Sequence, residues 1–334
     1  MPLAMRVVQR VVSAIDAWQQ RHGLPAFVFG VIRKFGDDRG GHLAALIAYY
    51  GFLSIFPLLL VFVTTLGFFL HDNASLRHDL LNSALADFPI IGAQLKNNVH
   101  ALGGNGLGLA IGIVGLLWGS LGVAQAAQHA MAEVWNVPGR VRPGFFPRLT
   151  RAVLVLAVLA VAIVATTTLT ASAALIGGSA AVTALTITAT VALNIGLYWL
   201  AFRVLTPASI ATRDLWPGAI VGGVAWTGLQ ALGGWLVARQ LRHTSELYGF
   251  FAIVLGLLFF LYLAGQLTVY ASEVNVVRAR KLYPRSVMPP PLTPADEHAL
   301  ADLARADERR PEQHIEVEFD KPVSSTQTTG NDNP

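Results

Sequence analysis

The feature that most constrains this chain is a stretch from residue 152 to residue 202 that holds no charged side chain. A helix needs about 20 apolar residues to cross a hydrocarbon layer about 30 Å thick, because each residue rises about 1.5 Å along the axis. The stretch is long enough for two crossings. Gly177, Gly178, Ser179 and Ala180 lie near its middle and can turn the chain between them. It therefore predicts two antiparallel membrane helices joined by a tight turn.

Four other segments share this apolar character, and only 13% of the 334 residues are charged. Soluble domains carry roughly a quarter of charged residues. A segment in lipid must pair its own backbone groups, which favours helices. The six predicted spans are residues 43–70, 107–127, 152–176, 181–202, 215–238 and 248–271. The predicted fold class is all-α, a polytopic bundle of six transmembrane helices with amphipathic helices at its N-terminal side.

Lysine and arginine gather before the first span, after the last span, and in the second and fourth connections. Basic connections stay on the cytoplasmic side of a membrane. We therefore expect a protein of the bacterial inner membrane with both termini in the cytoplasm. The expected regions are a cytoplasmic amphipathic segment (1–41), the transmembrane domain (42–284) and a mostly disordered acidic tail (285–334). Within the tail, Thr293 and Pro294 predict the start of a short helix that reaches about Glu308.

The N-terminal segment carries an apolar stripe with helical spacing, opposed by arginines. The stripe consists of Val7, Val8, Val11, Val12, Ile15 and Trp18. Such a helix can lie on the inner leaflet, or it can pack on the cytoplasmic ends of the spans. Both arrangements need the same stripe, so the sequence leaves them open.

Two segments carry a family resemblance. Residues 43–61 read LAALIAYYGFLSIFPLLLV, and residues 248–275 read YGFFAIVLGLLFFLYLAGQLTVYASEVN. The motifs are the paired tyrosines followed by Ser and Phe-Pro, and a Ser-Glu-Val-Asn ending after the last span. Residues 116–137 and 213–226 add further likeness. Together they resemble the YihY/BrkB family of bacterial inner-membrane proteins over residues 30–280.

This resemblance implies a six-helix membrane bundle without an agreed molecular activity. Some members of that family have carried a ribonuclease label that is generally regarded as a misassignment. Others are linked to serum resistance or suspected of transporting an envelope lipid. The resemblance supplies no catalytic residue to carry over.

A proline and a set of glycines are candidates for shaping the bundle. Pro57 frees the carbonyl of Leu53 inside the first span, which predicts a kink, and Ser54 can bond to nearby backbone. Glycines at three- and four-residue steps predict close helix packing in the second and fifth spans, with a sliding or gating surface as the alternative. These glycines are Gly108, Gly112, Gly115, Gly119, Gly218 and Gly222.

Polar residues inside the spans are the candidates for a cavity or a coupling site. Glu273 and Asn275 end the last span, and an ionised glutamate at that depth needs a partner. Arg203, Arg213 or Arg278 are the expected partners, in either a structural ion pair or a substrate or proton site. Four uncharged residues join the candidate list: Gln125, Asn194, Gln230 and Gln266.

The sequence predicts no catalytic, metal or cofactor site. There is no cysteine, which excludes disulfides and thiolate chemistry. His129 and Glu133 lie one helical turn apart, which is typical of a solvated helix end, since a metal site would need further ligands. The same reasoning applies to the His-Asp pairs at 71–72 and 78–79.

Three functions compete at this stage. A transporter or translocator of an envelope lipid or other small substrate fits the kinked span, the glycine-lined helices and the intramembrane polar residues. A non-transporting assembly or interaction protein fits the acidic tail and the basic second connection. A membrane hydrolase or nuclease lacks the motifs that it needs. The expected partners are the bilayer and anionic lipid head groups, with no nucleic acid, and an oligomer is compatible with the sequence.

Overall fold

The structure is a computed structural model that describes residues 3–69, 106–142, 144–176, 179–240 and 246–320. Across these residues every regular element is a helix. The long helices are α3 (Gly40–Phe69), α6 (Gly106–Val134), α7 (Phe145–Ile176), α8 (Ala180–Leu205), α9 (Trp216–Gln240) and α10 (Glu246–Arg280). They correspond to the six apolar segments, so the prediction that these segments are helices is confirmed. The predicted turn between α7 and α8 falls partly at residues 177–178, outside the described residues.

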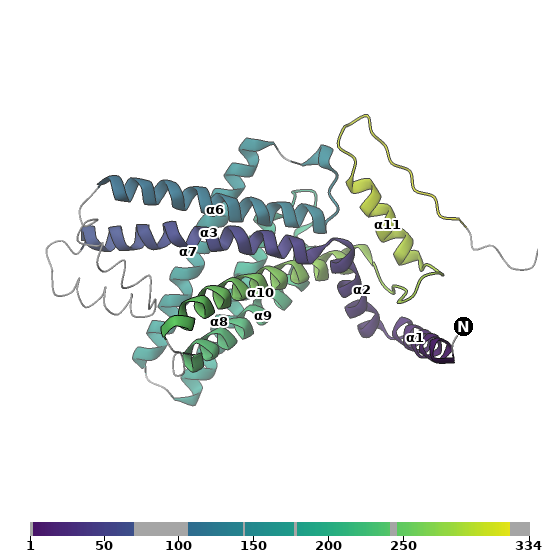
Figure 1. Ribbon diagram of the computed structural model, residues 1–334, viewed down its shortest axis with the longest axis horizontal. Coiled ribbons are helices and arrows are strands. Elements are labelled where there is room, and N and C mark those ends of the chain that lie inside the picture. Colours follow the sequence, from purple (N-terminus) through teal and green to yellow (C-terminus); the bar gives the residue numbers. More distant parts are fainter. Residues whose placement is uncertain (1–2, 70–105, 143, 177–178, 241–245, 321–334) are drawn as a thin grey trace, which may run out of the picture.

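The long helices form a ring in which each one contacts the next along the chain and α10 returns to α3. Figure 1 shows α3 and α6 lying side by side, with α10 alongside them. Small residues allow these approaches. A Cβ atom at Gly119 would lie 2.9 Å from Oγ of Ser54 on α3, and one at Gly222 would lie 2.6 Å from the ring of Tyr198 on α8.

The long helices expose large apolar side chains. Asn194 is buried on α8, whereas Leu185 and Ile187 of the same helix are more than half exposed. Trp118 on α6 and Leu255 on α10 are also largely exposed. Soluble monomers rarely leave such wide apolar surfaces uncovered. Among the described residues, two helical stretches are long and apolar enough to cross a bilayer, Ala180–Leu205 and Val254–Arg280.

One end of the bundle, which we call the α2 end, contains a cluster of buried apolar side chains. The short helix α2 (Gly23–Asp37) leads into α3 there and packs against α10, and Lys34 of α2 donates to the carbonyl of Val134 at the end of α6. Met131, Trp135, Val277 and Leu282 are fully or almost fully buried in this region. Two 3₁₀ turns, η1 (Gly139–Val141) and η2 (Thr212–Leu215), connect α6 to α7 and α8 to α9.

The C-terminal segment folds back onto the α2 end. The helix α11 (Pro294–Ala306) begins with Thr293 as its N-cap in a capping box with Asp296, which confirms the predicted short helix. The guanidinium of Arg285, 1% exposed, donates to Asp37 at 2.8 Å and to Asp296 at 2.5 Å. These ion pairs attach the start of the C-terminal segment and α11 to the end of α2. Residues 321–334 lie outside the described residues, and the three-region division stays a prediction.

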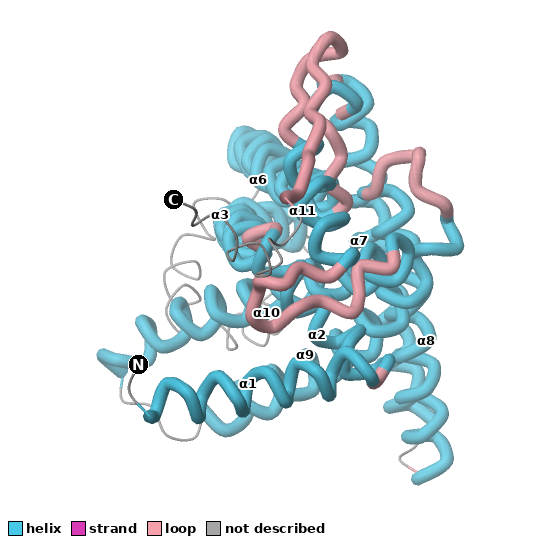
Figure 2. The backbone as a smooth tube through the Cα atoms, turned by 90° about the vertical axis from the view of Figure 1, so that its right-hand side faces the viewer, coloured by secondary structure: helices cyan, strands magenta, loops and turns pink. Residues whose placement is uncertain are grey.

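The first helix, α1 (Leu3–Arg21), lies across the bundle axis. It is seen nearly end-on in Figure 1 and lengthwise in Figure 2. The helix α3 is seen lengthwise in Figure 1 and nearly end-on in Figure 2. Gln19 donates to the carbonyl of Arg285 at 2.6 Å and holds α1 on the C-terminal segment. Val11, Ile15 and Trp18 are each more than half exposed. In the described structure this part of the apolar stripe is not packed on the ends of the long helices.

Candidate functional site

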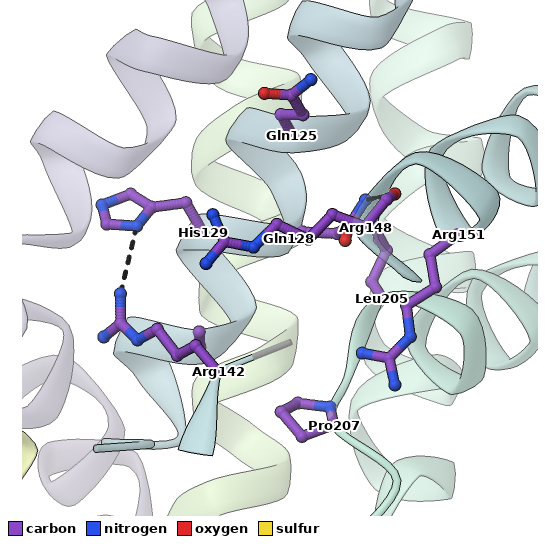
Figure 3. Close-up of a pocket in the computed structure, with 9 residues that line it drawn as sticks. Gln125, Gln128, His129, Arg142, Arg148, Arg151, Leu205 and Pro207 are labelled. Carbon is purple, nitrogen blue, oxygen red and sulfur yellow. Dashed lines mark hydrogen bonds between the residues drawn. The ribbon is translucent and has the colours of Figure 1, made fainter. Parts of the chain in front are cut away.

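A cavity of about 250 Å³ opens where the last turns of α6 meet the start of α7 and the end of α8. Polar side chains of α6 form one wall, and Leu205 and Pro207 form the opposite wall (Figure 3). Three arginines point into the same region. The lining residues are Gln125, Gln128, His129, Ala132, Arg142, Arg148, Arg151, Leu205 and Pro207. We call this the arginine pocket.

Arg142 is fixed in place by hydrogen bonds to α6 and its end. Its guanidinium donates to Oε1 of Glu133 at 2.9 Å and to the carbonyl of Val137 at 3.2 Å. Nδ1 of His129 lies 3.4 Å from the same guanidinium, the contact dashed in Figure 3. These contacts hold the cation at one rim of the pocket and orient its plane.

Arg148 and Arg151 stand on the first turns of α7. The amide of Gln128 donates to the backbone carbonyl of Arg148 at 3.2 Å, which ties α6 to the start of α7. A helix N-terminus carries a partial positive charge, so cations in its first turns are unfavourable unless an anion lies nearby. Two arginines in this position therefore favour a site that receives a negative group.

The lining of the pocket is rich in positive charge. It contains three arginines and no carboxylate, and Arg142 pairs with Glu133 beside the pocket. Guanidinium groups bind phosphate and carboxylate oxygens through paired hydrogen bonds. The described geometry thus suits a small dianionic or monoanionic head group such as a phosphate.

A second group of charges is buried at the α2 end, where α2, α6 and α10 meet. Nζ of Lys34 donates to Oδ2 of Asp38 and to the carbonyl of Val134 at 3.1 Å, and it lies 3.9 Å from Oε2 of Glu273. The side chains of Lys34 and Glu273 are 0% exposed, and that of Asp38 is 1% exposed. We call Lys34, Asp38 and Glu273 the buried triad.

Local structure places each member of the triad. Lys34 and Asp38 are one turn apart at the end of α2, a spacing that lets the two side chains meet. Asn136 lies in the turn after α6 with φ 45°, a left-handed conformation that asparagine tolerates, and its amide donates to Oδ1 of Asp38 at 3.3 Å. Burial raises the pKa of the Asp38 carboxyl, and the attraction of the Lys34 ammonium opposes this rise.

Comparison with known proteins gives the family. Residues 31–294 match the sequence profile of the family described as "Virulence factor BrkB". The chain belongs to the BrkB family. It is 29% identical to "Inner membrane protein YhjD" of Escherichia coli (strain K12) over 164 residues, which are 46% of this chain and 48% of that protein. It is 33% identical to an uncharacterized protein of Dickeya dadantii (strain 3937) over 114 residues, 31% of this chain and 34% of that protein.

The resemblance inferred from residues 43–61 and 248–275 is therefore confirmed. This BrkB-family chain spans about half or less of the length of the curated relatives that it matches. No solved structure matches it. Membership of the family identifies relatives but no activity. The arginine pocket and the buried triad are the features of the structure that bear on activity.

The structure corrects the expected partner of Glu273. From the sequence we expect Arg203, Arg213 or Arg278, whereas the described cation nearest to the carboxylate is Lys34. Arg213 is 89% exposed and lies 3.8 Å from its neighbour Asp214. The prediction failed because it considered cations near the spans in sequence, whereas α2 folds back against the end of α10.

The other polar candidates have separate described contacts. The amide of Asn194 donates to Thr227 at 2.9 Å and lies 3.5 Å from the amide oxygen of exposed Gln230. Gln266 donates to Tyr262 on its own helix at 3.1 Å. Only Gln125 lines the arginine pocket.

The remaining candidates concern helix contacts. Asn275 lies against Gly218, and Oγ of Ser54 donates to the carbonyl of Tyr50 at 2.7 Å. Gly115 is half-buried on α6. At Pro57, Gly108 and Gly112 the structure describes the helical backbone alone, so the predicted kink and those two contacts stay predictions.

The histidine-acid pairs have different outcomes. His129 and Glu133 approach to 3.7 Å at a partly exposed helix end, and Arg142 occupies the carboxylate of Glu133. In the described part of the chain no three His, Asp or Glu side chains are grouped as metal ligands. Residues 71–72 and 78–79 lie outside the described residues.

Sequence reasoning missed Lys34 and Asp38, and it treated the pocket arginines as topology signals and as a basic connection near anionic lipid, without predicting a pocket. The sequence contains a local pattern at the two triad residues and another at the pocket arginines. A Lys and an Asp four residues apart end α2, and arginines three residues apart begin α7. What the sequence could not supply is the long-range meeting of α2 with α10 and of α7 with α6.

Proposed function

We propose that this BrkB-family chain is an integral protein of the bacterial inner membrane, crossed by α3, α6, α7, α8, α9 and α10 with both termini in the cytoplasm. The exposed apolar faces and the buried Asn194 support membrane burial. The name of the Escherichia coli relative supports the inner membrane. The α2 end carries the helix ends richest in arginine and lysine, which supports its placement on the cytoplasmic side.

Contacts at that end join segments that the proposed topology puts on one side. Lys34 binds the carbonyl of Val134, and Arg280 donates to the carbonyl of Trp135 at 2.6 Å. The end of α6, the end of α10 and the start of α3 therefore lie together. The proposed topology requires this, because the chain has crossed the membrane twice at the end of α6 and six times at the end of α10. The exposed stripe of Val11, Ile15 and Trp18 then lies at the inner membrane surface.

We infer that the protein translocates an anionic lipid of the envelope, whose head group enters the arginine pocket. The observation that carries this inference is the pocket itself, a hollow with three arginines and no lining carboxylate at the cytoplasmic ends of α6, α7 and α8. A volume of about 250 Å³ admits a phosphate head group but not a whole lipid. The acyl chains would stay on the exposed apolar faces of neighbouring helices.

The test uses proteoliposomes that contain a fluorescent phosphatidylglycerol or its phosphatidylcholine counterpart. We expect protein-dependent movement of the anionic lipid between leaflets, measured by quenching the outer leaflet. Arg151→Gln should slow it about tenfold, since a hydrogen bond to a charged group contributes about 1.5–3 kcal/mol and about 1.4 kcal/mol is a factor of ten. Arg213→Gln is the matched control, because Arg213 is exposed and lies outside the pocket.

Three results would contradict the proposal: no lipid movement, equal movement of both lipids, or equal rates for Arg151→Gln and Arg213→Gln. Circular dichroism and size exclusion of each variant separate loss of fold from loss of translocation.

An assembly or interaction protein is the second candidate, and one observation favours it. Glu308 pairs with Arg140 at 2.9 Å and places the exposed segment 309–314 beside the connection between α6 and α7. A partner could read that composite surface. Charge reversal at Arg309 and Arg310 with unchanged cellular phenotype would remove this support. Neither candidate function is enzymatic, and the expected lack of enzymatic activity stays a prediction.

A further inference from the structure

The buried triad has an excess of negative charge if all its members are ionised. One ammonium, Lys34, faces two carboxylates, Asp38 and Glu273, and all three side chains are withdrawn from solvent. Burial of a net charge without compensation is strongly unfavourable. The triad has no net charge when one of the two carboxyl groups carries a proton, and this neutral form is the one compatible with burial.

The contacts of Glu273 point to the same conclusion. No donor among the described residues gives either of its oxygens a hydrogen bond that meets ordinary distance limits, since Lys34 stands at 3.9 Å. An oxygen of Asp38 and an oxygen of Glu273 both lie within 3.9 Å of Nζ of Lys34, so the two carboxyl groups lie side by side. Two carboxylates are both acceptors, so a hydrogen bond between them requires a proton on one.

In the described part of the chain, Lys34 is the cation that contacts the pair. From α2, Asp37 lies nearby, and its carboxylate is taken by Arg285 of the C-terminal segment at 2.8 Å. From the end of α6 come the carbonyl of Val134 and the neutral amide of Asn136. From α10 comes Tyr270, whose ring stacks on Phe35 at 3.8 Å between centroids.

We propose that Asp38 and Glu273 form a proton-binding site in which one exchangeable proton is shared between the two carboxyl groups beside Lys34. Release of that proton leaves a buried negative charge between α2 and α10. Water entry relieves this charge, so deprotonation weakens the contact between the two helices. The site itself depends only on the geometry of the triad.

The role of the site rests on the proposed function. If the protein moves an anionic lipid, proton release at the α2 end would open the cytoplasmic ends of α2, α6 and α10 and couple lipid movement to a proton gradient. The proton would then be the coupling ion of this translocator.

Infrared difference spectroscopy of the full-length protein in nanodiscs tests occupancy. A titration from neutral to alkaline pH should remove a carbonyl stretch typical of a protonated carboxylic acid. The band should be absent in Glu273→Gln and unchanged in Glu312→Gln, a matched change on an exposed acid. A spectrum in which wild type and Glu273→Gln do not differ would overturn the site.

Stability against pH gives a second, independent readout. A carboxyl group that keeps its proton in the folded state contributes fully to stability below the ordinary carboxyl pKa, and this contribution is lost progressively as the pH rises from there to the pKa of the site. The melting temperature of the wild type should therefore fall on going to alkaline pH. Glu273→Gln should flatten this dependence, because its amide can donate to Asp38 as the protonated acid does.

Asp38→Asn is the reciprocal variant, and it should also flatten the profile, by donating to Glu273. A profile that stays as steep as that of wild type in both variants would refute the proton site. Dependence on sodium concentration in place of pH would refute it as well.

The proteoliposome assay then separates the two proposals. Lipid movement that responds to a pH gradient in wild type but not in Glu273→Gln supports the coupling role. Lipid movement indifferent to the gradient, with the infrared band present, refutes coupling and leaves the translocator standing. Absence of lipid movement with the band present refutes the translocator and leaves the proton site standing.

Discussion

Oδ1 of Asn275 accepts a hydrogen bond of 2.6 Å from the backbone N–H of Gly218. Gly218 is the third residue of α9, and the first N–H groups of a helix have no partner within it. A side chain of α10 thus satisfies the start of α9. Because Gly218 has no side chain, the two helices can approach closely enough to form this bond.

We predict that Gly218→Ala separates α9 from α10. A Cβ atom at this position would collide with the carbonyl oxygen of Ala271 and with the amide of Asn275. Overpacking of this kind costs about 1–3 kcal/mol, and the lost hydrogen bond adds to it. The melting temperature of the purified protein in detergent should fall.

Gly228→Ala is the control for that experiment, since it changes the same residue type on the same helix. Nothing lies within 4 Å of a Cβ atom at Gly228. Alanine is also the better helix former by about 1 kcal/mol. The control should leave the melting temperature unchanged or raise it, and equal losses in both variants would contradict the assigned contact.

We predict that Arg285→Met releases the C-terminal segment. The substitution keeps an apolar stem but leaves the carboxylates of Asp37 and Asp296 without their shared cation. Breaking a buried ion pair from one side costs about 3–5 kcal/mol. Limited proteolysis should cut near α11 at a much lower protease concentration than in wild type. Arg310→Met, an exposed change on the same segment, should leave the cleavage pattern as it is.

The docking of α11 should depend on pH with a defined sign. Burial acts to raise the pKa of Asp296, but hydrogen bonds from Arg285, Ser286 and Thr293 outweigh it and lower the pKa below the ordinary value. A carboxyl group with a lowered pKa stabilises the folded state above its ordinary pKa, and this contribution is lost as the pH falls through the lowered value. Hydrogen exchange in α11 should stay slow at neutral and mildly acidic pH and accelerate only in stronger acid.

Asp296→Asn checks the assignment of that acid transition. The amide cannot form the ion pair with Arg285, so exchange in α11 should already be faster at neutral pH and should change less on acidification. An unchanged acid transition in this variant would mean that another carboxyl group controls it. Asp302, which pairs with Arg280 at 2.6 Å, would be the next residue to substitute.

The sequence predicts the helices of this fold well and the contacts between them poorly. The apolar segments are read from local periodicity and length, and Thr293 with Pro294 marks the start of α11 because capping is a local effect. The triad needs Lys34 to meet Glu273 across 239 positions of the chain, which no local pattern encodes. The arginine pocket likewise needs α6, α7 and α8 to converge. Charge counting could identify these arginines as basic connections but not as the walls of a cavity.

The proposed topology predicts the accessibility of single cysteines, and the natural absence of cysteine makes the whole chain a clean background. Arg213→Cys lies in η2 and Glu312→Cys beyond α11, both on exposed positions at the α2 end, whereas Ala180→Cys is exposed at the start of α8. In right-side-out membranes a membrane-impermeant thiol reagent should label Ala180→Cys and spare the other two until the membrane is opened by detergent. In inverted vesicles the pattern should reverse. Labelling of Ala180→Cys and Arg213→Cys from the same side would mean that α8 does not cross the bilayer, and the six-crossing topology would be wrong.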